Sequence, residues 1–368
     1  MTNALFSENR VKLGVMAFNC SHGSTVTTAD GAWAMNWDEN AELARMADAA
    51  GLEVLLPVGC WKGYGGETDF NNRTFESLTW ASAIAAITTY STVFSTVHAP
   101  LIHPVAAAKM MATIDHVSSG RFALNVVAGW FKNEFEMFNV DLAPHDQRYD
   151  YAAEWLDLVK RLWTEPESFD FDGKFFQGKA LWSQPKPLQS PRPPIMNAGS
   201  SETGHAFSAQ HADMNFAMLR QKDEDSDRAQ ITHLKQMATD LGRSSQCWIH
   251  VYVVCRDTEK EARDYLNHYV VEKGDDVAVG NMLDIFGVQS GTLSPDVLEA
   301  FKFHFKAGHG GYPLVGTPEQ IVDNIERLSR MGVDGLLMSW VDYLGECRQW
   351  IDCVLPLMEQ EQRKPFTP

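Results

Sequence analysis

The chain has 368 residues, of which 45% are hydrophobic and 21% charged, and its formal net charge at pH 7 is −17. This is the composition of a globular protein, and the negative charge disfavours nucleic acid and anionic membranes, so we expect a small-molecule ligand; simple solubility explains the charge equally well. No apolar run reaches the ~20 residues of a membrane helix. There is no signal-peptide pattern and no CxxC pair among the six cysteines, so we expect a cytoplasmic protein with free thiols.

Short apolar runs alternate with longer helical stretches along the chain. The expected strands are 11–18, 52–58, 91–99, 121–129, 194–199, 213–219, 247–255 and 333–341. The expected helices are 37–51, 75–90, 103–120, 148–163, 200–212, 227–242, 257–273, 317–332 and a last helix that ends near residue 362. Proline near the first turn and glycine after the last turn mark the helix 103–120, and Thr317 is the expected N-cap of the helix that follows it.

Eight strands, each followed by a helix, predict an α/β protein with a (β/α)8 TIM barrel, formed by residues 1–368 as a single domain. An open doubly wound sheet is the competing fold, but eight successive units favour closure. We expect insertions after the fourth and seventh strands, at about 130–147 and 275–316. Residues 169–182 predict a β-hairpin, because aromatic residues flank an Asp-Gly turn there.

In such a barrel the site lies at the carboxyl ends of the strands. The fourth strand, in RFALNVVAGW, carries the polar residue Asn125 among apolar neighbours. A buried amide without partners costs roughly 1–3 kcal/mol, so either neighbouring backbone satisfies Asn125 or its side chain faces a ligand. The third strand brings Thr96 and His98 to the same end of the barrel.

Two loops at this end have a ligand-binding and a purely structural interpretation. The NAGSS turn, with Ser200 and Ser201, opens a helix whose free amides could bind phosphate, although a plain serine N-cap would look the same. The glycine-rich KGYGG at 62–66 could form a mobile lid or a loop that needs positive φ. Neither a Walker motif nor GxGxxG after a strand is present.

The sequence predicts no metal site, because no HxH or HExxH motif occurs and a hydrogen-bonded histidine is the plainer interpretation of each histidine. Aromatic residues follow several strands: Trp61, Trp130, Phe131 and Trp340. They could stack on a planar ligand, and core packing is the alternative for each of them.

Four ordered segments carry a resemblance to a known family. They are GYGGETDFNNRTFES, MMATIDHVSSGRFALNVVAGWFKNEFE, QRYDYAAEWLDLVKRLW and NAGSSETGHAFSAQHADMNF. The chain resembles the bacterial luciferase-like flavin monooxygenases from about residue 11 to 220, and more weakly to its end. Within them it is most similar to the pyrimidine monooxygenases. The resemblance implies a barrel that binds reduced FMN, supplied by a separate NAD(P)H:flavin reductase, with dioxygen as co-substrate.

The resemblance also implies roles for particular residues. Thr96 and Asn125 would be catalytic, beside the flavin N5 edge and the dioxygen pocket. Further flavin contacts are implied at Gly59, Cys60, Glu134, Arg148, Tyr149, Ser200 and Ser201. Of these, Arg148 and Ser201 would lie at the phosphate.

One departure bears on the substrate. Pyrimidine monooxygenases have a lysine where this chain has Cys60, with Lys62 two residues on. We expect oxidative cleavage of a C–N bond in a nitrogen heterocycle, either a uracil-like pyrimidine or riboflavin, as in a riboflavin lyase. Alternatives are an organosulfur monooxygenase and a flavin-binding protein without turnover. A metal-dependent barrel hydrolase is a more distant alternative. The resemblance further implies a homo-oligomer.

Overall fold

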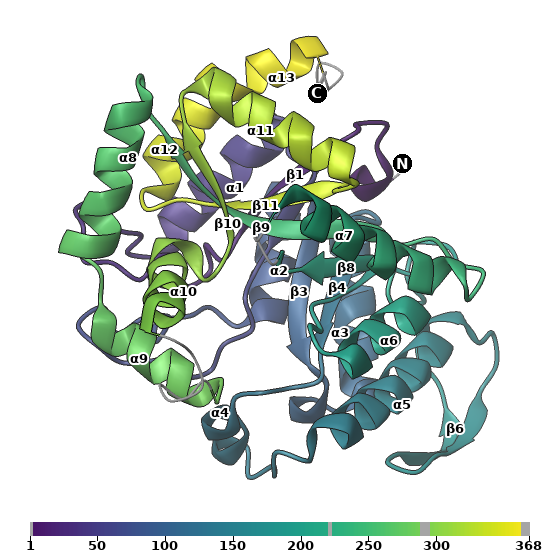
Figure 1. Ribbon diagram of the computed structural model, residues 1–368. Helices are drawn as coiled ribbons and strands as arrows, with labels where there is room; N and C mark the ends of the chain where they lie inside the picture. The colour runs from purple at the N-terminus through teal and green to yellow at the C-terminus, as the bar shows by residue number, and fades with distance from the viewer. Residues whose placement is uncertain (1–2, 220–222, 288–294, 362–368) are drawn as a thin grey trace.

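A computed structural model describes residues 3–219, 223–287 and 295–361. Its centre is a closed parallel barrel, which confirms the predicted fold (Figure 1). The barrel strands, in spatial order, are β1 (Lys12–Met16), β2 (Val54–Leu56), β3 (Thr92–His98), β4 (Phe122–Val127), β7 (Ile195–Asn197), β8 (Met214–Ala217), β9 (Gln246–Cys255) and β11 (Gly335–Ser339). Each pairs with the next in parallel, and β11 pairs with β1 to close the ring.

A ninth strand, β10 (Tyr312–Gly316), was not expected from the sequence. It pairs with β9 from Val251 to Cys255, whereas β8 reaches only from Gln246 to Ile249 on the same strand. β9 is longer than its neighbour, so its last residues present backbone groups that β10 satisfies. The strand lies in the stretch 275–316, where no clear pattern was apparent.

Helices surround the barrel and cover its outer face (Figure 1). Those between strands or after β11 are α1 (Trp37–Ala49), α2 (Ser77–Ile87), α3 (Pro104–Val117), α5 (His145–Thr164), α6 (Glu202–His211), α7 (Glu224–Thr239), α8 (Glu259–Asn267), α11 (Pro318–Met331), α12 (Tyr343–Gln349) and α13 (Leu355–Glu361). Local sequence explains their ends. Thr317 and Gln320 form a capping box at the start of α11, and Gly332 ends it with a φ of 105°.

Both predicted insertions contain regular structure. The first holds α4 (Lys132–Met137), and the second holds α9 (Asp276–Ile285) and α10 (Pro295–Gly308). The residues 169–182 form the expected antiparallel hairpin of β5 (Phe169–Asp172) and β6 (Gln177–Leu181). Within the described residues, no helix is long and apolar enough to cross a membrane.

The core has an inner and an outer layer. Phe94 of β3 and Ala123 of β4 belong to the small cluster that fills the barrel, together with Trp248 of β9. Val93 and Leu124 instead join the large cluster between the strands and the helices. Since strand side chains alternate between faces, Thr96 and Asn125 point inward, two residues beyond Phe94 and Ala123 toward the carboxyl ends of the strands.

Candidate functional site

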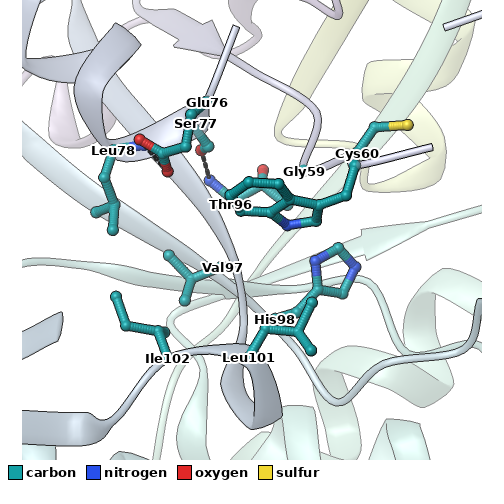
Figure 2. A pocket seen from close by; sticks show the side chains of 11 residues that line it. Gly59, Cys60, Glu76, Ser77, Leu78, Thr96, Val97, His98, Leu101 and Ile102 are labelled. Carbon is teal, nitrogen blue, oxygen red and sulfur yellow. Dashed lines mark hydrogen bonds between the residues drawn. The ribbon is translucent and has the colours of Figure 1, made fainter. Parts of the chain in front are cut away.

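A cavity lies at the carboxyl end of β2 and β3, beneath the loop that follows β2 (Figure 2). It contains about 410 Å³ of space, part of which is open solvent. Its lining residues are Gly59, Cys60, Trp61, Glu76, Ser77, Leu78, Thr96, Val97, His98, Leu101 and Ile102. Three predicted contact residues, Gly59, Cys60 and Thr96, therefore share one wall.

Asn125 stands beside Thr96 in register on the neighbouring strand. Its amide nitrogen donates to the Thr96 hydroxyl at 3.2 Å, and that hydroxyl donates to the backbone oxygen of Pro57 at 2.5 Å. Because the Thr96 proton is used on Pro57, the hydroxyl can only accept from Asn125. The amide orientation follows from this chain of donors, and it leaves the Asn125 Oδ1 atom buried without a partner.

The backbone at Gly59 comes unusually close to β3. A Cβ atom there would lie 2.9 Å from the Thr96 carbonyl oxygen and 3.2 Å from His98 Cε1, so a larger residue would push the loop away from the cavity. Next to it, burial and the nearby Glu134 raise the pKa of the Cys60 thiol to about 12. Cys60 is therefore neutral at physiological pH, unlike the lysine expected in pyrimidine monooxygenases.

Glu134 belongs to α4 and is only 2% exposed. Its carboxylate accepts hydrogen bonds from the backbone N–H of Trp61 at 2.5 Å and of Lys62 at 3.2 Å. Burial raises the pKa of this carboxyl. Glu134 thus holds the loop after β2 against the first insertion, and its contact with a flavin stays a prediction.

A second group of predicted residues gathers where α5 and α6 begin. Arg148 donates to the backbone oxygen of Gly129, just beyond β4, and its buried Nε has no partner. Burial raises the pKa of the Tyr149 hydroxyl, and a hydrogen bond with the Ser201 side chain partly offsets this.

Ser201 is the N-cap of α6 and accepts from the backbone N–H of Gly204 at 3.0 Å. The Tyr149 hydroxyl lies against two glycines, since a Cβ on Gly199 or Gly204 would come within 2.8 or 2.7 Å of it. Ser200 is exposed beside them. A guanidinium and a helix N-terminus at one place suit a phosphate group.

The aromatic residues divide into two kinds. Trp130 and Phe131 stack with Tyr64 in the packed cluster under the insertions, at interplanar angles of 11° and 9°. Trp340 packs on Trp350 in the outer core. Core packing is therefore the correct interpretation for Phe131 and Trp340, whereas Trp130 is half-buried and Trp61 lines the cavity.

The structure adds residues to which the sequence assigned no role. Ser77 at the start of α2 accepts a hydrogen bond from the Thr96 backbone N–H at 2.6 Å, and His98 lines the cavity two residues beyond Thr96. The alternation of the strand was a usable signal for His98. Among the residues that the structure describes, no group of three or more His, Cys, Asp or Glu side chains could hold a metal ion.

The chain is similar to known proteins over most of its length. The family model described as luciferase-like monooxygenase matches residues 11–335. The FMNH2-dependent dimethylsulfone monooxygenase of Pseudomonas putida is 31% identical over 371 residues, covering 96% of this chain and 97% of that protein. The pyrimidine monooxygenase RutA of Acinetobacter baylyi is 27% identical over 371 residues, covering 97% and 99% respectively.

Solved structures agree on the architecture. The riboflavin lyase RcaE, crystallised with modified FMN and its substrate riboflavin, superposes with a TM-score of 0.86 at 22% identity, covering 97% of this chain and 94% of that one. DmoA from Hyphomicrobium sulfonivorans gives a TM-score of 0.84 at 19% identity, covering 98% and 91%. At these identities the likeness establishes a shared fold.

Proposed function

The chain belongs to the luciferase-like monooxygenase family, and we propose that it is a monooxygenase that uses reduced FMN and dioxygen at the barrel mouth. In this proposal the reduced flavin comes from a separate flavin reductase. Reduced FMN, when bound, supplies the electrons that activate dioxygen. The protein contributes binding, orientation and exclusion of water.

One observation carries the proposal: the buried, partnerless Oδ1 of Asn125, which lies beside Thr96 near the carboxyl ends of β3 and β4. A buried acceptor without a donor costs free energy, and a ligand N–H placed there would recover it. The N5 position of reduced flavin carries such an N–H, whereas N5 of oxidised flavin does not. An amide oxygen fixed by Thr96 and Pro57 therefore suits the reduced form.

The second group of residues fits the other end of FMN. Arg148 offers a buried donor that nothing in the described chain accepts, and the N-terminus of α6 offers backbone amides beside Ser201. A phosphate monoester would accept from both. We assign the phosphate to this place and the ring system to the wall formed by Thr96 and Asn125.

The loop after β2 would keep the reacting edge dry. Its residues Gly59 and Cys60 line the cavity (Figure 2), and Glu134 holds the loop on one side. On the other side Asp275 accepts from the Thr68 backbone N–H at 2.7 Å. Exclusion of water protects reactive intermediates from hydrolysis and other side reactions.

For the substrate, cleavage of a C–N bond in a uracil-like heterocycle or riboflavin is the first candidate, supported by the 27% identity to a pyrimidine monooxygenase. Oxidation of an organosulfur compound is the second, supported by the 31% identity to a dimethylsulfone monooxygenase. The neutral Cys60 removes a cation from the site, which favours the second candidate over uracil itself.

An aerobic assay with NADH, FMN and a flavin reductase tests the proposal. Uracil, thymine, riboflavin and dimethylsulfone are supplied separately, and products are measured against controls without the enzyme or without dioxygen. We expect one of them to be consumed in a flavin- and dioxygen-dependent way. Flavin that binds and reoxidises without any product would instead indicate a flavin-binding protein without turnover.

A further inference from the structure

His98 is a buried polar side chain that points into the cavity without a partner. It is only 5% exposed, and it lines the cavity from the inner face of β3. Figure 2 shows its ring facing the loop that carries Gly59 and Cys60. Within the described residues no hydrogen bond to its imidazole is present, whereas the buried His250 pairs with the Ser339 hydroxyl at 2.8 Å.

Buried imidazole nitrogens normally have hydrogen-bond partners. Neither nitrogen of His98 is among the sealed, partnerless atoms of the described chain, and the residue lines the cavity. The imidazole of His98 is therefore available to form a hydrogen bond with a ligand in the cavity. His98 follows Thr96 on the same face of β3, which places the two polar groups one pleat apart along one wall.

The charge state of His98 follows from its burial, which lowers the pKa of its imidazole to about 4. Near pH 7 the ring is neutral and offers one N–H donor and one acceptor nitrogen. Its surroundings add no positive charge. Of the other titratable lining groups, Cys60 is a neutral thiol, and the carboxylate of Glu76 already accepts from the backbone N–H of Leu78 and Thr79.

The lining of the cavity therefore disfavours anions. It contains no lysine or arginine, one carboxylate, and apolar side chains from Leu78, Val97, Leu101 and Ile102. An anionic ligand would lose its hydration without gaining a cation, which is costly in a partly buried site. An uncharged molecule with an acceptor oxygen would lose little and could accept the imidazole N–H.

We propose that His98 determines substrate specificity by donating a hydrogen bond to an acceptor oxygen of an uncharged substrate, such as a sulfonyl or ring carbonyl oxygen. This inference rests on the proposed function. It places sulfones and uncharged heterocycles among the substrates and excludes sulfonates and carboxylated heterocycles.

The test compares His98→Leu, which removes the donor, with His98→Gln, which retains an N–H. His233→Gln is the matched control, because His233 is an exposed histidine on α7. Two probe pairs differ in charge: dimethylsulfone with methanesulfonate, and uracil with orotate. Binding of each probe to the FMN-free protein is measured by saturation-transfer NMR, KM and kcat by the coupled assay, and FMN affinity by fluorescence titration.

We expect at least one uncharged probe to bind the wild-type protein and its charged counterpart to bind at least tenfold more weakly. His98→Leu should weaken binding of the uncharged probe and raise KM about tenfold, equivalent to about 1.4 kcal/mol, with little change in kcat because uniform binding is lost. His98→Gln should recover most of the affinity. FMN affinity and the control variant should match the wild type.

The inference is overturned if neither uncharged probe binds, if a charged counterpart binds equally well, or if His98→Leu binds as tightly as the wild type. It is also overturned if His98→Leu weakens FMN as strongly as the probe, since His98 would then belong to the flavin site. Binding that depends on His98 without any turnover would support the inference and contradict the proposed function. Turnover by His98→Leu with an unchanged KM would support the proposed function and contradict the inference about His98.

Discussion

At the scale of single residues, the buried amide of Asn125 links stability to function. Its nitrogen is satisfied by Thr96, but its oxygen is buried without a donor. In the absence of ligand this atom costs the folded state free energy, on the order of 1–3 kcal/mol. Such a cost is expected where a site is prepared for a ligand rather than for stability.

Replacing Asn125 with leucine tests this link. Asn125→Leu keeps the branching and the number of heavy atoms of the side chain and removes the partnerless oxygen, so we expect the free energy of unfolding of the FMN-free protein to stay the same or rise by about 1 kcal/mol. Flavin-dependent turnover should be lost. Urea unfolding and the coupled assay measure the two effects. A fall in stability of more than about 2 kcal/mol, or full turnover, would contradict the assigned role.

Arg148 is predicted to recognise the phosphate rather than the ring. Arg148→Ala should raise the Kd for oxidised FMN by at least about tenfold, because a charge-assisted hydrogen bond is worth about 1.5–3 kcal/mol. Binding of riboflavin, which lacks the phosphate, should change little. Fluorescence titrations with both flavins measure this, with the exposed Arg263→Ala on α8 as control. Equal loss of affinity for both flavins would argue against a phosphate contact.

At the scale of elements, the loop after β2 is joined to both insertions. Glu134 of α4 binds the loop on one side, and Asp275 at the start of α9 binds it on the other. The two carboxylate oxygens of Asp275 have different hydrogen-bond partners. Its Oδ1 caps α9 through the N–H of Ala278 at 3.0 Å, and its Oδ2 accepts from the Thr68 backbone and hydroxyl at 2.7 and 2.8 Å.

Because the two oxygens of Asp275 have separate partners, a substitution can break the contact with Thr68 and leave the cap of α9 in place. In Asp275→Asn the amide oxygen can still cap α9, but the amide nitrogen then faces the N–H of Thr68. We expect the Thr68 amide to exchange with deuterium about tenfold faster or more at neutral pH, while the α9 amides stay protected. Asp223→Asn is the control, because Asp223 caps its own helix α7 and, among the described residues, makes no hydrogen bond to the loop after β2. Unchanged exchange at Thr68 would exclude this role for Asp275.

The contact between Asp275 and Thr68 is expected to depend on pH. Burial is the largest influence on the Asp275 carboxyl and raises its pKa, but hydrogen bonds from Thr68 and Ala278 outweigh it, so the net pKa is lowered. The stabilisation is therefore complete above the unfolded value of about 3.9 and is lost as pH falls through the lower folded value. Acid should weaken the contact with α9, measured as protease cleavage near Thr68 at decreasing pH.

Element prediction succeeded where periodicity was strong and failed in the insertions. The helix α11, with its capping box and terminal glycine, was predicted from a dozen local residues. The helices α9 and α10 were not, because their apolar residues, such as Val279 and Phe305, pack against the loop residues Tyr64 and Phe70 rather than against the barrel.

At the scale of the whole molecule, closure of the barrel depends on the end of the chain. β11 lies between β1 and β9 and pairs with both. A chain that ends at residue 332 would leave two apolar strands with unpaired edges. We expect this truncated chain to show no cooperative thermal transition by circular dichroism, whereas a chain that ends at residue 361 should unfold cooperatively. Cooperative unfolding of the shorter chain would contradict the prediction that residues 1–368 form a single domain.

By itself the sequence determined the strands that form the barrel and most of the surrounding helices, because apolar periodicity and end caps act over a dozen residues or fewer. The family followed from the resemblance of four ordered segments. The sequence also indicated that Asn125 and Thr96 lie at the mouth. Only the tertiary structure decided which amide atom of Asn125 is free and that Glu134 binds the loop after β2. These features depend on hydrogen bonds and packing between residues far apart in the sequence, which no local pattern encodes.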